Sequence, residues 1–366
     1  MTAAEEILEL ARWAPSGDNT QPWRFSIVSG DHIVVNAFDT RDRCVYDLDG
    51  RASQVAVGAL LETMRIAATA SGRRIAISRR PGTPDRRPSF DVHLGPPDAV
   101  ETDLLIGAIR HRCVQRRSLQ TTALGAPRKS RLEQSVGPSS RIVWFEGARQ
   151  KARMAWLATR SAKIRLTIPE AYAVHRDIIE WGARHSVDRV PDQALGAGPV
   201  SLAVMRWAMH SWARIDRMNR FAGGTVGPRI ELDLIPALRC GAHFAIVADR
   251  VPETLDDFLA AGAAMQRFWL TATTLGLQLQ PQYTPLVFAR YARMGVCFTQ
   301  VPAARRRASE VAIRMETLLP GQASHVVFMG RLGEGPVAAA RSTRLDLSEL
   351  CRESEAHQQA VRNGRS

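Results

Sequence analysis

One short segment of the sequence combines residue types that suit the binding of a flat heteroaromatic ring. Residues 14–25 read Ala-Pro-Ser-Gly-Asp-Asn-Thr-Gln-Pro-Trp-Arg-Phe. Pro15 ends the helical pattern before it, and the small residues that follow leave backbone NH groups uncovered. The side-chain amides of Asn19 and Gln21 both donate and accept hydrogen bonds. Such side chains suit a heteroaromatic ring that carries hydrogen-bond donors and acceptors on its edges. The order of residues favours a ring-binding loop, although composition alone favours an ordinary loop with its aromatic residues in the core.

A basic run at residues 110–118 is the second candidate group. Arg112 and Arg116 stand four positions apart in it. Two guanidinium groups can hold a phosphate dianion through paired, charge-assisted hydrogen bonds. Taken without the upstream loop, the same run is more typical of a solvated basic helix end.

The loop resembles the FMN-binding loop of the nitroreductase superfamily, in which an APSxxNxQPW stretch follows a helix and precedes the first strand. The matching positions are Ala14, Pro15, Ser16, Asn19, Gln21, Pro22 and Trp23. The resemblance implies that the flavin is contacted by Pro15, Ser16, Gly17, Asn19 and Gln21. It also implies that Arg112 and Arg116 hold the flavin phosphate, with Val114 standing where relatives often carry a hydroxyl.

Two later segments resemble further parts of the same family. Gln280 and Pro281 follow a long helix, as does the family segment that approaches the flavin N5 edge, but a loop at the end of a core helix fits equally well. Arg341 and Arg344 resemble the family's arginine-containing tail, and the resemblance implies that they add to the phosphate site. Surface arginines would look the same.

The ring loop precedes the phosphate arginines within one long chain, and this order resembles the fused, single-chain branch of the superfamily. The resemblance implies an α+β nitroreductase-like fold, with an antiparallel-rich central sheet, packed helices and two half-modules. We expect the first half-module at 1–105, with the ring loop, and the second at 106–350, with the arginines. A candidate lid lies at 188–230, and the tail at 351–366 is expected to fray.

Hydrophobic periodicity predicts the elements that position these residues. Short turns rather than helices join the paired strands, which favours antiparallel sheets. A helix of small residues at 58–72 is echoed at 262–276, and its alanine spacing predicts close helix packing. The predicted helices cover 3–13, 52–71, 101–110, 148–165, most of 170–220 and 254–275, and the predicted strands cover 23–28, 33–37, 74–77, 90–94, 141–145, 243–248, 294–298 and 325–329.

Composition bounds the class of protein. The chain has 366 residues, 45% hydrophobic and 23% charged, which is typical of a globular protein with about two domains or one large one. No apolar run is long enough to cross a bilayer, and acids stand near the N-terminus where a signal peptide carries bases, so we expect a cytoplasmic protein. The five cysteines form no CxxC pair, which predicts free thiols and no zinc. His175, His185, His210 and His243 stand singly, so no metal site is expected.

A formal net charge of +13 raises the question of nucleic acid. The arginines are spread along the chain and do not alternate with aromatic residues that could stack on bases, so a small anionic ligand is favoured over nucleic acid. We expect a small-molecule substrate, no nucleic-acid or membrane partner, and either a monomer that acts as a pseudo-dimer or a homodimer.

The resemblance implies an FMN-dependent oxidoreductase of the nitroreductase type. The expected cycle is two-electron and ping-pong, with hydride passing from NAD(P)H through FMN N5 to an electron-poor small molecule. The sequence leaves two alternatives open, an FMN-dependent dehydrogenase of a biosynthetic intermediate and a flavin-binding storage protein without turnover. No catalytic residue is assigned, because the flavin carries the chemistry.

Overall fold

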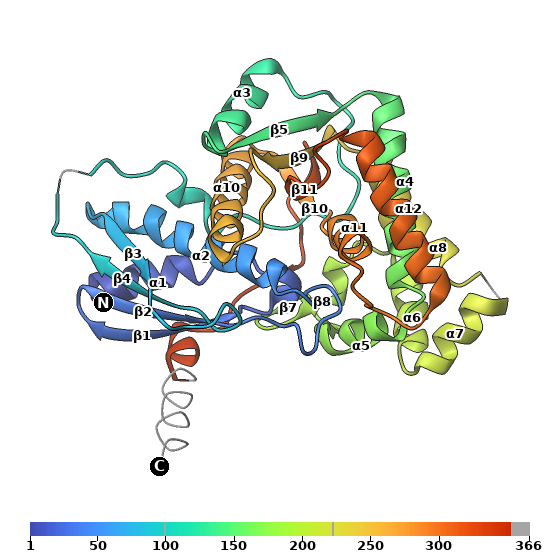
Figure 1. Cartoon of the computed structure of the whole chain (residues 1–366), viewed down its shortest axis with the longest axis horizontal. Helices are drawn as coiled ribbons and strands as arrows, with labels where there is room; N and C mark the ends of the chain where they lie inside the picture. The colour runs from blue at the N-terminus through green and yellow to red at the C-terminus, as the bar shows by residue number, and fades with distance from the viewer. Residues whose placement is uncertain (99, 222, 353–366) are drawn as a thin grey trace, which may run out of the picture.

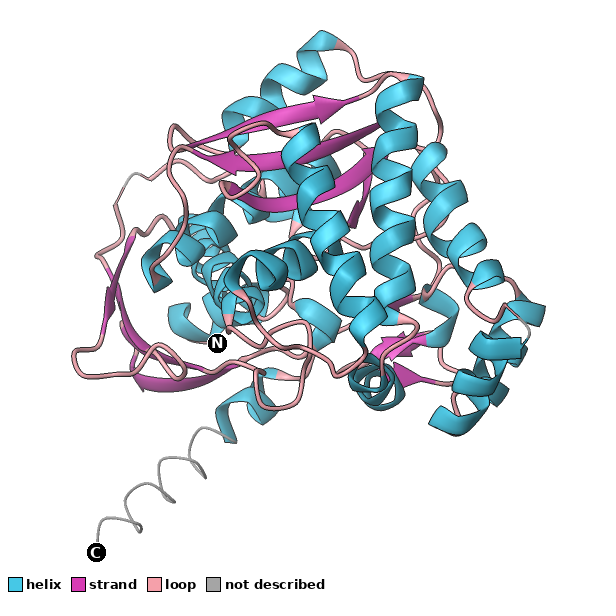
Figure 2. Ribbon diagram, turned by 45° about the vertical axis from the view of Figure 1, so that its right-hand side comes forward, coloured by secondary structure: helices cyan, strands magenta, loops and turns pink. Residues whose placement is uncertain are grey.

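The computed structural model describes residues 1–98, 100–221 and 223–352. Two four-stranded antiparallel sheets organise it, in the orders β1-β2-β4-β3 and β10-β11-β9-β5. Helices separate and cover the two sheets (Figure 1, Figure 2). In the described residues the only parallel ladders are two residues long, β6 with β8 and β7 with β12. The predicted α+β class with antiparallel sheets is confirmed, with the strands divided between two sheets.

The first sheet and its helices arise from the first hundred residues. Thr2 and Glu5 form a capping box that starts the first helix, and Gly72 at φ 64° ends the α2–η2 helical stretch. The apolar residues of the strands alternate, so one face packs on α1 and α2 while the other faces solvent. The elements are α1 (Ala3–Ala11), η1 (Gly17–Asn19), β1 (Trp23–Ser29), β2 (His32–Ala37), α2 (Arg51–Ala68), η2 (Thr69–Ser71), β3 (Ile75–Arg79) and β4 (Ser89–Leu94).

The middle of the chain is mostly helical, as predicted, with a break near 188–198. The helix predicted at 101–110 is wrong, because only the 3-10 turn η3 forms there. Side chains take its first amides instead: Asp103 N donates to Thr69 Oγ1 and Leu105 N to Asp103 Oδ1, both at 2.9 Å. The elements are η3 (Ile106–Ala108), α3 (Ala126–Ser135), β5 (Ser140–Phe145), α4 (Ala148–Arg165), α5 (Pro169–Ile178), β6 (Ile179–Glu180), β7 (His185–Ser186), β8 (Val190–Pro191), η4 (Asp192–Ala194), α6 (Pro199–Ala208) and α7 (Trp212–Phe221).

The last third supplies most of the second sheet. The strand predicted at 294–298 is wrong, because Met294 ends a helix, Gly295 adopts φ 67°, and Phe298 packs on Phe288 from a loop. The longer helices α11 and α12 were not predicted, and neither were the short helices α8 and α9. The elements are α8 (Val226–Arg229), η5 (Ile230–Leu234), α9 (Ile235–Leu238), β9 (Ala242–Ala248), α10 (Leu255–Thr274), β10 (Gln278–Pro281), α11 (Thr284–Met294), α12 (Pro302–Leu318), β11 (Val326–Gly333) and β12 (Arg341–Ser342).

Helix α10 packs against one face of the second sheet, while α4, α11 and α12 pack against the other (Figure 2). This arrangement explains why β9 is buried along nearly its whole length and reads as a continuous apolar run. Helices α2 and α10 cross at the centre of the molecule (Figure 1). A Cβ atom built on Gly58 would lie 2.1 Å from Leu259 O, and one on Gly262 would lie 2.1 Å from Val55 O. The predicted close packing of the two small-residue helices is therefore present.

The end of the described chain returns to the first sheet. Leu350 is fully buried in the core formed by α1, α2 and that sheet, and Leu345 N donates to Gln21 Oε1 at 3.0 Å. The half-module boundary near 105 stays a prediction. The predicted frayed tail, 351–366, falls outside the described residues except for Cys351 and Arg352. Among the described helices, none is long and apolar enough to span a membrane.

Candidate functional site

A single cavity of about 780 Å³ collects almost all the site residues that the sequence predicts. This size lies within the range of small-molecule and cofactor pockets. Residues before and after position 105 line it, so the two sheets and the helix pair between them position one shared site. Of the predicted residues, Gln21 alone does not line the cavity, and those that do are Pro15, Ser16, Gly17, Asn19, Arg112, Arg116, Gln280, Pro281, Arg341 and Arg344.

The predicted ring loop has an unusual backbone. Asp18, Asn19 and Gln21 adopt φ values of 52°, 61° and 44°, a region that non-glycine residues rarely enter. Ser16 Oγ accepts from Gln21 N at 2.9 Å and so closes the loop on itself. Strain of this kind persists only where the surroundings fix the conformation, and it is concentrated at functional sites.

The two amides of the loop hold it against distant parts of the chain. Asn19 Nδ2 donates to Val187 O at 3.0 Å, and Gln21 Nε2 donates to the same oxygen at 2.8 Å. Gln21 is fully buried and also accepts from Leu345 N. Gln21 is therefore a residue that shapes the loop, and only Asn19 of the two reaches the cavity.

Two arginines, Arg112 and Arg344, donate hydrogen bonds to the backbone at the start of this loop. Arg112 Nη2 donates to Trp13 O at 2.9 Å, and Arg344 donates to Ala14 O through Nε at 3.0 Å and Nη2 at 2.9 Å. The guanidinium of Arg112 also lies 4.6 Å from the ring centre of Trp269 on α10. Residues about 100 and 330 positions apart in sequence thus meet beside the loop.

Arg116 and Arg341 complete a group of four cavity-lining arginines. Arg116 Nη1 donates to Ala194 O at 3.0 Å, and Arg341 donates to Arg110 O at 3.0 Å and to Arg112 O at 3.2 Å. Backbone carbonyls orient all four guanidinium groups, and among the described residues none of the four is in an ion pair with a carboxylate. Asp18 attracts Arg116 without forming an ion pair with it, and the positive charge on this wall of the cavity is otherwise open to an anionic ligand.

Burial and mutual repulsion disfavour the charges of Arg112 and Arg344. Burial lowers the pKa of Arg112 to about 10, and Arg341 adds to the effect. The pKa of Arg344 falls well below its usual value, first through burial and then through Arg112 and Arg341. Arginine side chains in proteins nevertheless stay charged at neutral pH. An anion bound among them would remove the repulsion, so the wall is electrostatically prepared for one.

Three buried polar atoms of these residues have no partner within the described chain: Asn19 Oδ1, Arg112 Nε and Arg341 Nε. An unpartnered buried polar atom costs free energy, and native structures rarely leave one without reason. Two of the atoms are donors in the arginine group, and the third is an acceptor in the ring loop. This donor set fits a ligand with an anionic group at one end and an NH group at the other.

Arg331 is a positioning residue that sequence reasoning missed. It is fully buried on β11, and its Nη2 donates to Arg116 O at 2.6 Å and Arg117 O at 2.9 Å, while its Nε donates to Gln280 Oε1 at 2.7 Å. The Arg331 guanidinium thus holds in place both the segment that carries Arg116 and the side chain of Gln280. A lone charge in the apolar run Val326–Gly333 was the signal that could have revealed it.

Polar side chains that the sequence did not single out line another part of the cavity. Tyr46 Oη lies 2.9 Å from His175 Nε2, and Arg165 is paired with Asp233 at 3.0 Å. Burial lowers the pKa of His175 to about 3 and raises the pKa of Tyr46, so both are neutral at pH 7. Burial also raises the pKa of Asp18, which Arg116 and Arg165 oppose. Tyr46 and His175 thus present neutral hydrogen-bonding groups to the cavity, beside the Arg165–Asp233 ion pair.

Residues of the candidate lid, 188–230, form much of the remaining wall. Apolar side chains of α6, Val200, Val204 and Met205, face the cavity together with Met218 of α7. Whether the segment opens stays a prediction. Its placement makes the cavity apolar on this side and basic at the arginine group.

Comparison with known proteins places the similarity first in the N-terminal segment. Residues 2–54 match the model described as the Nitroreductase family. The uncharacterized protein MT1398 of Mycobacterium tuberculosis (strain CDC 1551 / Oshkosh) is 25% identical over 347 residues, covering 93% of this chain and 47% of that protein. The putative NAD(P)H nitroreductase acg of M. tuberculosis (strain ATCC 25618 / H37Rv) is 35% identical over 98 residues, or 26% of this chain and 29% of that protein.

A further M. tuberculosis protein, the uncharacterized Rv3127 of strain ATCC 25618 / H37Rv, is 42% identical over 82 residues, covering 21% of this chain and 24% of that protein. The chain thus spans less than half the length of each of these relatives. Among solved structures, a nitroreductase with bound FMN from Bacteroides fragilis NCTC 9343 aligns with a TM-score of 0.32 and 10% identity, over 64% of this chain and 90% of that one.

Proposed function

We propose that the chain is a member of the nitroreductase superfamily, which the match of residues 2–54 supports, and that it is an FMN-binding oxidoreductase that acts on an electron-poor small molecule. One observation carries the proposal. Four arginines that form no ion pair with a carboxylate of the described residues line the same cavity as the strained loop at 15–19. An FMN molecule has a phosphate dianion at one end and a flat ring with mixed polar edges at the other, and this cavity offers a complement to each.

The donor set assigns a role to each group of residues. Arg112, Arg341 and Arg344 would hold the phosphate, with Arg116 at the edge of the group, because guanidinium forks bind phosphate bidentately. Pro15, Ser16 and Gly17 would lie against the ring, and Asn19 Oδ1 would accept from a ring NH or a ribityl hydroxyl. Gln280 and Pro281 approach the cavity from β10, where Arg331 holds the Gln280 side chain.

When bound, FMN supplies two-electron hydride chemistry at N5, with NAD(P)H proposed as the donor. The chain's own contribution is to bind, orient and exclude water. Helices α6 and α7 cover the cavity with apolar side chains. Tyr46 and His175 present a neutral hydrogen-bonded pair to its interior, which can orient an uncharged polar substrate or deliver a proton from the Tyr46 hydroxyl. We also propose that one chain builds a complete site as a pseudo-dimer.

The phosphate assignment predicts that Arg112→Ala combined with Arg116→Ala weakens FMN binding at least tenfold. A hydrogen bond to a charged group contributes about 1.5–3 kcal/mol, so losing two such groups exceeds a tenfold effect. The measurement is an FMN titration of the apoprotein by fluorescence quenching. Arg117→Ala is the matched control, because Arg117 neighbours Arg116 but does not line the cavity. Equal affinities in the double variant and the control would refute the assignment.

Activity is tested separately from binding. The absorbance spectrum of the purified protein should contain a flavin band, and anaerobic addition of NADH or NADPH should bleach it within seconds. Slow or absent bleaching with bound flavin would favour the dehydrogenase or the storage protein. A protein that cannot be loaded with FMN would contradict the proposed function altogether.

A further inference from the structure

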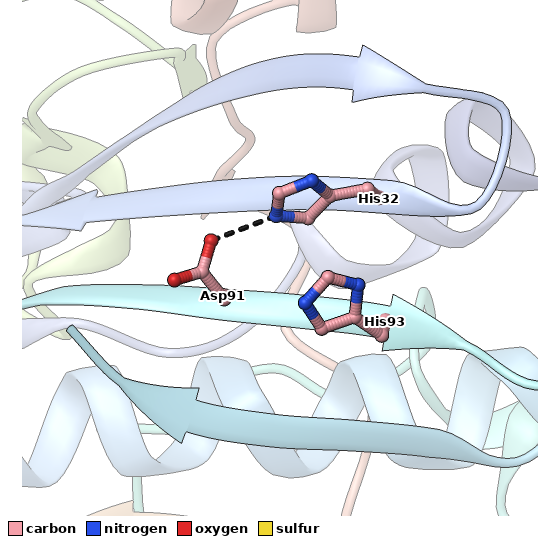
Figure 3. A group of neighbouring side chains, drawn as sticks. All are labelled: His32, Asp91 and His93. Atoms are coloured by element: carbon pink, nitrogen blue, oxygen red, sulfur yellow. Dashed lines mark hydrogen bonds and ion pairs between the residues drawn. The ribbon is translucent and has the colours of Figure 1, made fainter.

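Two histidines and an aspartate gather on the outer face of the first sheet, away from the cavity. His32 on β2 lies directly opposite His93 on β4, and Asp91 is two residues before His93. Because side chains alternate along a strand, Asp91 and His93 share a face, and the cross-strand register brings His32 to the same face. Figure 3 shows the three side chains clustered between the two strands. Their nearest ligand atoms all lie within 4.8 Å of one another.

We propose that His32, Asp91 and His93 bind one divalent transition-metal ion of the Zn²⁺ class. Imidazole nitrogens combined with a carboxylate oxygen suit Zn²⁺, Ni²⁺ and Cu²⁺, whereas Ca²⁺ and Mg²⁺ prefer sites made of oxygen atoms. Three protein ligands leave further positions for water. No sequence pattern reveals the group, because His32 lies about 60 residues before Asp91 and His93 and only the register of β2 and β4 joins them.

The present geometry is close to that of a ligand set. His32 Nε2 donates to Asp91 Oδ1 at 2.7 Å, and the rings of His32 and His93 stack with centroids 4.2 Å apart and an interplanar angle of 22°. An ion would take the place of the proton between His32 and Asp91, and a small rotation of His93 would bring in the third ligand. The backbone under the ligands is fixed, because Ile33 and Val92 on the opposite face are fully buried.

Arg80 competes with a metal ion for the Asp91 carboxylate. It follows β3 and donates two hydrogen bonds to Asp91, from Nε to Oδ2 at 2.9 Å and from Nη2 to Oδ1 at 2.8 Å. The Arg80 side chain is 41% exposed, and ion pairs so open to solvent contribute little to stability. A metal ion can therefore displace the guanidinium from Oδ1 at small cost, while Nε keeps Oδ2 oriented. None of these residues lines the large cavity, so the inference does not depend on the proposed function.

The test uses the full chain, untagged and freed of metal, titrated with Co²⁺ and with Zn²⁺. We expect one Co²⁺ per chain with a visible absorption spectrum typical of nitrogen and oxygen ligands. His93→Ala should weaken binding at least tenfold, since it removes one of three ligands. Arg80→Ala should tighten binding up to about fivefold, the most that loss of an exposed ion pair allows. His210→Ala is the matched control, because it removes an exposed histidine outside the group and should leave binding unchanged.

Several outcomes would overturn the proposal. One is the absence of stoichiometric binding in both the wild-type chain and Arg80→Ala. Another is equal affinity in wild type and His93→Ala. A cobalt–thiolate charge-transfer band would assign the ion to a cysteine such as the exposed Cys297. Circular dichroism of each variant checks the fold, and a rise in thermal unfolding temperature with Zn²⁺ in wild type but not in His93→Ala would support an ion that joins β2 to β4.

Discussion

Buried charged and titratable side chains in this protein obtain many of their partners from backbone carbonyls. Arg331 donates to the carbonyls of residues 116 and 117, Lys151 Nζ donates to Cys240 O at 2.7 Å, and His243 Nε2 lies 2.7 Å from Ala237 O. A carbonyl satisfies a donor without neutralising its charge. Contacts of the same kind hold Arg112 and Arg344 at the cavity without neutralising them, so its wall stays basic, as an anionic ligand needs.

His243 carries a testable consequence at this scale. Burial lowers its pKa to about 4, although its two hydrogen bonds oppose the shift. The unfolded chain protonates this histidine below a pKa of about 6.5, so between pH 6.5 and 4 the unfolded state binds the extra proton. Stability is lost as the pH falls through this window, by roughly 1.4 kcal/mol per pH unit.

We expect His243→Gln to lose about 2 kcal/mol less than wild type when the pH is lowered from 7.5 to 5. Urea unfolding at the two pH values measures the difference, and each protein serves as its own reference at pH 7.5. His210→Gln, at an exposed position, should behave as wild type. Identical losses in His243→Gln and wild type would show that the histidine does not resist protonation in the fold.

At the scale of elements, the crossing of α2 and α10 sets the distance between the two halves of the site. The ring loop precedes the first sheet, and Trp269, whose ring lies against the Arg112 guanidinium, stands on α10. This helix pair therefore relates the position of the loop to that of the arginine group. The backbones approach so closely that no side chain fits at the crossing. The small-residue spacing that repeats at 58–72 and 262–276 is what permits this close approach.

Gly58→Ala should destabilise the protein by about 2 kcal/mol, although alanine favours helix more than glycine does. The new methyl group would overlap Leu259 O, and overpacking at a fixed backbone contact costs more than the propensity gained. Gly107→Ala is the control, because a Cβ there meets nothing within 4 Å. Denaturant midpoints of the two variants measure the effect, and a Gly58→Ala protein as stable as the control would contradict the close crossing.

At the scale of the whole molecule, the end of the described chain packs against its beginning. The segment after β12 runs back to the first sheet, where Arg344 contacts Ala14, Leu345 contacts Gln21 and Leu350 enters the core. The last arginines of the cavity are thereby held in place by the first core. This returning segment joins the parts of the chain that form the two sheets, so we expect them to unfold together.

Leu350→Ala tests this coupling. Removing a fully buried leucine side chain should cost about 3 kcal/mol and lower the stability of the whole protein. Differential scanning calorimetry should show one transition shifted to lower temperature, with Ser348→Ala, an exposed neighbour, close to wild type. A separate low-temperature transition, with the rest of the protein unchanged, would mean that the first core unfolds on its own.

The sequence by itself determined the parts that depend on local order. Short turns between paired strands indicated antiparallel sheets, the small-residue spacing indicated the close helix pair, and the order of residues at 14–23 carried the resemblance that implied an α+β fold. Wrong local predictions, at 101–110 and 294–298, arose where side chains of other elements or a single glycine decided the outcome. Local propensity is a weak guide at such places, because tertiary contacts override it.

Only the tertiary structure decided which residues share a site. Sequence order could not place Arg331, Tyr46 or His175 at the cavity or behind its wall, and it could not separate Gln21, which shapes the loop, from Asn19, which faces the cavity. The same holds for His32, Asp91 and His93, which strand register alone brings together. The physical reason is common to all of them: cross-strand register, helix crossing and burial depend on long-range contacts, and these appear in no local sequence pattern.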